Sequence, residues 1–135
     1  MKKTLVLVAV CLTSCQTSQM ATPEPTHPYS LSASETAAVQ EGVRKSLKDP
    51  TSPIFGNIKA AASDTQKGII YVCGIVNAKN SFGGYTGDGP YVGVLASMTA
   101  EGKNLSTFNV TGMAGTEIQT SVVMDMCKHY GIVGG

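Results

Sequence analysis

Apolar side chains occupy nearly every position from Ile69 to Val76, and this stretch limits the possible folds most. At a period of two, both sides of a strand here are apolar. One side carries Ile69, Tyr71, Cys73 and Ile75, and the other carries Ile70, Val72 and Val76. Such a strand lies at the centre of a sheet. We expect helices to cover one face, and an interface or a curled sheet to cover the other.

A segment rich in glycine and small polar residues follows, from Lys79 to Gly89. It predicts a long loop, and long loops in compact domains are usually binding elements or disordered. Donors, acceptors and a stacking ring for a glycan or peptide would come from Asn77, Lys79, Asn80, Ser81 and Tyr85. The alternative interpretation is purely architectural, because asparagine and serine also cap turns and glycine permits positive φ.

The residue pattern of this region resembles that of a known protein family. Asp49-Pro50 and Phe55 are followed by Cys73-Gly74-x-Val76-Asn77-Ala78-Lys79-Asn80-Ser81-Phe82-Gly83-Gly84-Tyr85-x-Gly87. This pattern is similar to that of small, uncharacterised bacterial envelope proteins and lipoproteins, and it covers the middle of the chain. The family has no established activity. The resemblance therefore implies an envelope domain and transfers no catalytic residue.

The first 14 residues read as a secretory signal. Met1-Lys2-Lys3 is a positive start, and the short apolar core that follows, LVLVAVCL, ends at polar Thr13. This core is far shorter than the roughly 20 residues that span a bilayer. The run Leu12-Thr13-Ser14-Cys15 resembles a lipobox, which implies that Cys15 becomes the acylated first residue of the mature protein. An ordinary cleaved signal is the alternative.

The resemblance to lipoproteins also implies a location. Gln16 after the modified cysteine implies the outer membrane of a Gram-negative host, with the domain in the periplasm, whereas a Gram-positive host would keep the protein on the plasma membrane. Residues 15–30 are rich in proline, threonine and serine, which predicts an extended tether between the lipid and a domain at 31–135. His27 lies in this tether, where we expect it to be solvated.

The domain begins with a helix, because Ser32 and Glu35 have the spacing of a capping box. Its buried stripe is Val39, Val43 and Leu47, and Asp49-Pro50 ends it. Strands are expected at 57–62, 69–76, 90–98 and 105–111. Ile54 and Phe55 are expected to enter the core, and Pro90 to stand at the first position of its strand.

A last helix follows, which Thr116 can cap and Gly131 can end. Its apolar stripe is expected to hold Ile118, Val122, Met126 and Tyr130, widened by Val123 and Cys127. The fold class predicted is α+β, with an N-terminal helix, an antiparallel sheet of about four strands, a C-terminal helix and one disulfide. The length of 135 residues fits a single domain.

The four cysteines divide into two groups. Cys11 leaves with the signal and Cys15 takes the lipid, so Cys73 and Cys127 remain in the domain. Outside the cytoplasm we expect them to form a disulfide. The alternative is a thiol hydrolase in which Cys73 or Cys127 is the nucleophile beside His129, and Asp125 orients the histidine ring.

Other chemistry finds little support in the sequence. Two histidines, one of them in the tether, make no recognisable metal pattern, and no cofactor is expected. The glycine run leads into Pro90 and a strand, unlike a phosphate-binding loop. Removal of residues 1–14 changes the net charge from +1 to −1, which offers no basic face to nucleic acid.

The sequence therefore predicts a lipid-anchored envelope protein that binds or helps to assemble a partner without catalysing a reaction. A protein or a glycan of the envelope is the expected partner. An envelope hydrolase, a hydrolase inhibitor and a purely structural lipoprotein are the alternatives.

Overall fold

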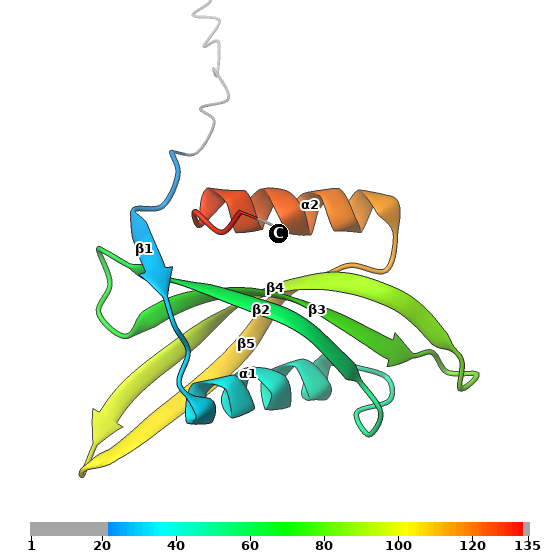
Figure 1. The fold of residues 1–135 in the computed structure, drawn as a ribbon, viewed down its shortest axis with the longest axis horizontal. Coiled ribbons are helices and arrows are strands. Elements are labelled where there is room, and N and C mark those ends of the chain that lie inside the picture. Colours follow the sequence, from blue (N-terminus) through cyan, green and yellow to red (C-terminus); the bar gives the residue numbers. More distant parts are fainter. Residues whose placement is uncertain (1–21, 134–135) are drawn as a thin grey trace, which may run out of the picture.

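The computed structural model describes residues 22–133. They form an α+β domain in which a five-stranded antiparallel sheet has the strand order β1-β2-β3-β4-β5. The elements are β1 (Thr26–Tyr29), α1 (Ala33–Ser46), β2 (Ile54–Ser63), β3 (Ile69–Lys79), β4 (Tyr85–Ala100), β5 (Lys103–Met113) and α2 (Glu117–His129). Figure 1 shows the sheet between the two helices, with α2 above it and α1 below.

Strand β3 is the centre of the sheet, and its two apolar sides face two separate cores. On the α1 side, Ile70, Val72 and Val76 pack with Val39 and Val43 of the helix. On the α2 side, Tyr71 and Cys73 pack with residues of the second helix. The period of two is confirmed. The expectation that both helices cover one face is wrong, because each face of β3 needs its own apolar cover.

Helix α1 begins where the capping box predicts. The Glu35 N–H donates to Ser32 Oγ at 3.2 Å, and the Ser32 N–H donates to Glu35 Oε2 at 2.9 Å. Burial by itself would raise the pKa of Glu35, but hydrogen bonds to its carboxylate from the Ser32 N–H and from neighbouring hydroxyls, among them that of Tyr29, lower the pKa below its usual value. The start of the helix is thereby fixed to the end of β1.

Strand β1 corrects the predicted tether, because part of 15–30 belongs to the sheet. Thr26 to Tyr29 pair with Ser63 to Ala60 of β2. Asp64 N–H donates to the Pro25 carbonyl, which by alternation turns the nitrogen of Pro28 away from β2. Proline is tolerated in such an edge strand because no ladder hydrogen bond is lost. The fifth strand of the sheet comes from this segment.

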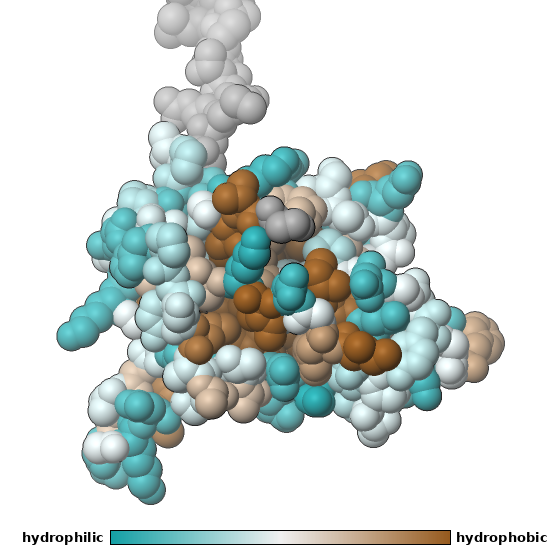
Figure 2. Space-filling view, viewed as in Figure 1, coloured by the Kyte–Doolittle hydropathy of each residue, from teal (hydrophilic) through white to brown (hydrophobic). Residues whose placement is uncertain are grey.

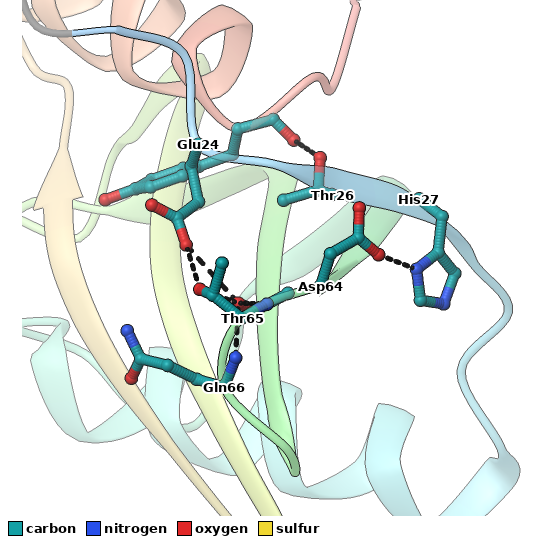
Figure 3. Close-up of polar contacts among 8 residues, drawn as sticks. Glu24, Thr26, His27, Asp64, Thr65 and Gln66 are labelled. Atoms are coloured by element: carbon teal, nitrogen blue, oxygen red, sulfur yellow. Dashed lines mark hydrogen bonds and ion pairs between the residues drawn. The ribbon is translucent and has the colours of Figure 1, made fainter.

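Side chains around β1 hold it against β2 and α2 (Figure 3). Thr26 Oγ1 donates to the Tyr130 carbonyl at 2.8 Å, and Thr65 Oγ1 donates to Glu24 Oε1 at 3.0 Å. His27 is exposed, but its Nδ1 lies 2.6 Å from Asp64 Oδ1. His27 is thus exposed as expected, but it lies in β1 and not in a tether.

The predicted strands at 57–62, 90–98 and 105–111 all lie within longer strands of the structure. Phe55 packs against the core as expected, whereas Ile54 is 55% exposed at the start of β2. Pro90 lies inside β4, not at its first position. Its carbonyl accepts from the Ala114 N–H, so its nitrogen faces the side where β5 has ended, and no bond to β3 is lost.

A disulfide between Cys73 and Cys127 joins β3 to α2, as predicted. Thr116 caps the helix by accepting from the Gln119 N–H, and Gly131, with φ 71°, follows its end. The predicted stripe is partly wrong. The side buried on the sheet holds Val123 and Cys127, whereas Ile118 is 80% exposed because it lies on a flank of the helix.

Candidate functional site

The segment predicted as a long loop is mostly the end of a β-hairpin. Asn77 pairs with Asp88, and Lys79 pairs with Tyr85, so β3 and β4 continue almost to the turn. We call residues 77–85 the hairpin tip. It projects from one end of the sheet (Figure 1). The prediction of a long loop at 79–89 is wrong, because glycines at 84, 87 and 89 lie beside or within an extended strand.

Asn80 builds the turn of the hairpin tip. Its Oδ1 accepts from the Phe82 N–H at 2.9 Å and from the Gly84 N–H at 3.1 Å. Its backbone N–H donates to the Gly84 carbonyl at 2.8 Å, and Gly83 adopts a φ of 83°. A side chain that substitutes for backbone acceptors in this way fixes a turn. Asn80 therefore has an architectural role in this structure.

Asn77 also bonds within the hairpin. Its Oδ1 accepts from the Gly87 N–H at 3.1 Å, where β4 has a φ of 91° at Gly87. Thr86 Oγ1 donates to the Ala78 carbonyl at 3.1 Å on the same irregular stretch. The register of the two strands shifts between Asn77 and Lys79, which accounts for these substitute bonds.

Tyr85 fastens the hairpin tip to the connection between α1 and β2. Its hydroxyl donates to the Ser52 carbonyl at 3.1 Å, and the Lys79 ammonium lies 5.3 Å from the centre of its ring. The distance between Lys79 and the ring fits a cation–π contact. Tyr85 is exposed at this end of the domain, and Lys79 beside it is half-buried.

The connection beneath Tyr85 is itself fixed by Asp49. Its carboxylate accepts from the Thr51 hydroxyl at 2.6 Å, the Thr51 N–H at 2.9 Å and the Ser52 hydroxyl at 2.8 Å. These bonds, with a smaller contribution from the charge of Lys79, lower the pKa of Asp49 to about 2. The Ser52 carbonyl in turn accepts from the Tyr85 hydroxyl, so Asp49 supports the hairpin tip indirectly.

Phe82 is the residue of the hairpin tip that sequence reasoning did not select. It stands in the turn between Ser81 and Gly83 and is 96% exposed. Ser81 is exposed beside it. A large aromatic side chain within an otherwise small, polar turn is the signal that could have identified it, because turn geometry needs no such group.

The residues of the thiol-hydrolase alternative are engaged elsewhere. The sulfurs of Cys73 and Cys127 bond to each other, which leaves neither available as a thiolate in this oxidised state. Asp125 lies 3.7 Å from Lys128, and within residues 22–133 no hydrogen bond joins it to His129. The described residues also hold no group of three or more potential metal ligands among histidine, cysteine, aspartate and glutamate.

The predicted signal peptide and the acylated Cys15 lie outside the described residues. Neither helix of residues 22–133 has the length and apolarity needed to cross a bilayer. Comparison of the chain with protein-family models, curated proteins and solved structures found no match to any of them.

Proposed function

We propose that this protein is a lipid-anchored envelope protein whose domain binds another envelope protein through the hairpin tip and does not itself catalyse a reaction. Acylated Cys15 would hold the protein at the outer membrane, with the domain in the periplasm. Phe82 would enter an apolar pocket of the partner, and Lys79 and Tyr85 would contact the rim of that pocket.

The exposure of Phe82 on a fixed turn carries this proposal. The N–H groups of Phe82 and Gly84 are bound by one Asn80 side chain, and Tyr85 ties the turn to Ser52. An aromatic group held in place loses little conformational entropy on binding, which favours its use as an anchor. Asn77 and Asn80 were predicted as ligand contacts. In this proposal they contribute to binding indirectly, because they fix the conformation of the hairpin tip.

The experiment is site-specific photo-crosslinking of the full chain in cells. The variant Phe82→p-benzoylphenylalanine places the photo-reactive ring at the hairpin tip, and Ile118→p-benzoylphenylalanine places it at an exposed apolar position of α2. We expect one defined protein adduct from position 82 and none from position 118. Equal labelling from both positions, or adducts with glycan only, would contradict the proposal.

Substitutions separate a binding surface from an architectural one. Phe82→Ala should remove the adduct formed by a crosslinker at position 81 while the melting temperature stays the same, because the ring contacts solvent. Asn80→Ala should lower both the yield of the adduct and the melting temperature, because it removes two hydrogen bonds of the turn. Loss of thermal stability with Phe82→Ala would assign the ring a structural role.

The predicted anchor has its own test. Mass spectrometry of the purified protein should find a chain that begins at Cys15 with attached acyl chains, such as palmitate, and Cys15→Ser should release the protein from the membrane fraction. An unacylated amino terminus in the wild-type protein would contradict the anchoring, independently of the result at Phe82.

A further inference from the structure

One edge of the sheet is only partly covered. Strand β1 ends at Tyr29, opposite Ala60, whereas β2 continues from there to Ile54. Among the described residues, this part of β2 pairs with β3 on one side, apart from an irregularity between Phe55 and Ile58, and with no strand on the other side. We call Ile54–Lys59 the open edge.

The backbone of the open edge presents hydrogen-bonding groups outward. In antiparallel pairing, every second residue of a strand directs its N–H and carbonyl to the same neighbour. The bond from the Asp64 N–H to Pro25 sets this alternation, so that Ala62 and Ala60 face β1. Ile58 is the next residue in the series, and its N–H and carbonyl face the position that β1 does not reach.

A cavity of about 480 Å³ adjoins this position and has apolar walls from both faces of the sheet. Tyr29, Leu31 and Ile58 line it and belong to the core on the α1 side. Ala61, Ile132 and Val133 also line it, and Ala61 and Ile132 belong to the core on the α2 side. Figure 2 shows apolar groups gathered across the middle of the molecule, between the levels of the two helices. An added strand could place every second side chain against these apolar groups.

Two cations lie beside the open edge. The Lys59 ammonium donates to the Val133 carbonyl at 3.2 Å, and the Arg44 guanidinium lies 5.0 Å from the centre of the Phe55 ring. The ion pairs within residues 22–133 are His27–Asp64, Lys45–Glu41 and Lys128–Asp125, so neither Lys59 nor Arg44 is neutralised by a carboxylate there. A segment that carries acidic side chains would complement both cations.

We propose that the open edge binds an extended, acidic segment of a partner protein, which adds to β2 as a strand beyond the end of β1. Backbone hydrogen bonds at Ile58 supply affinity, and the cavity selects apolar side chains at alternate positions. A second copy of this chain fits less well, because antiparallel pairing of two open edges brings the cations of both copies together. This site is separate from Phe82 and goes beyond the proposed function of the hairpin tip.

The test uses the full chain purified in mild detergent and a fluorescent eight-residue peptide of alternating valine and glutamate. We expect saturable binding by fluorescence anisotropy. A peptide that is N-methylated on every residue should bind at least about tenfold more weakly, because neither of its edges can donate to a strand. Hydrogen exchange should show slower exchange within Ile54–Lys59 when the peptide is bound.

Two charge variants complete the design. Lys59→Glu should weaken binding of the acidic peptide by about tenfold, whereas Lys67→Glu, in the turn between β2 and β3, should leave it unchanged. Phe82→Ala should also leave it unchanged, which separates this site from the hairpin tip. Equal binding of the N-methylated peptide, no binding of either peptide, or protection outside β2 would overturn the proposal. If the protein self-associated and Lys59→Glu altered that association, the proposal would be overturned, because the open edge would then bind a second copy of this chain.

Discussion

The ring of Tyr91 lies over Gly74, its partner across β3 and β4, and fills the space that a side chain at Gly74 would need. A Cβ at this position would lie 2.5 Å from Tyr91 Cζ. An aromatic ring that covers a glycine on the adjacent strand protects the backbone and fills the gap in the core. Tyr91 is fully buried on the α1 side of the sheet and contacts Phe108 edge to face.

Gly74→Ala should therefore destabilise the domain. The added methyl group overlaps the fully buried ring of Tyr91, so we expect a loss of about 1–3 kcal/mol in the free energy of unfolding. Chemical denaturation measures it. The control is Gly84→Ala in the same hairpin, where the nearest atoms to a Cβ lie 3.9 Å away, and its effect should be small. Equal effects of the two variants would contradict this account.

Tyr91→Phe should stabilise the domain or leave it unchanged. The buried hydroxyl of Tyr91 has no hydrogen-bond partner within residues 22–133, and its burial raises the pKa of the phenol well above the usual value. Removal of a polar atom that is buried without a partner relieves its desolvation cost, so we expect a gain of up to about 1 kcal/mol in the free energy of unfolding. A clear loss in chemical denaturation would show that the hydroxyl is bonded in solution.

The disulfide should contribute strongly to stability. Cys73 and Cys127 are 54 residues apart, and closing a loop of this size restricts the unfolded chain by about 4 kcal/mol. The double variant Cys73→Ser, Cys127→Ser should lose about that amount, and hydrogen exchange should rise first in α2, which only one sheet face supports. A reducing agent should lower the free energy of unfolding of the wild-type protein and leave that of the double variant unchanged. Equal sensitivity of both proteins would show that the stabilisation has another source.

Much of this fold could be predicted because its signals are local. The capping box of Ser32 and Glu35, the cap at Thr116 and the alternation in β3 each depend on residues close in sequence. The pairing of Cys73 with Cys127 followed from elimination among few cysteines. The caps and the alternation can be recognised from a few neighbouring residues, without knowledge of distant contacts.

The errors concern segments whose structure depends on distant partners. Pro25 and Pro28 favour an extended chain, and only β2 makes that chain a strand. The spacing of four at Ile118 and Val122 also fits a flank of α2, and only contact with the sheet selects Val123 and Cys127 instead. Phe82 was passed over because a sequence does not reveal which apolar residues stay uncovered.

Acid should destabilise the domain through Asp49. Its pKa falls from the ordinary value of 3.8 to about 2 in the folded state, so the folded state binds this proton less readily. The contribution of Asp49 is therefore complete above about pH 4 and is lost as the pH falls toward 2. Asp49→Asn keeps an acceptor for Thr51 but removes the titration, so its melting temperature should fall less over this range. Asp88→Asn, an exposed position in β4, should behave as wild type. If Asp49→Asn followed the wild-type curve between pH 4 and pH 2, the hydrogen bonds around Asp49 would not stabilise the connection that receives Tyr85.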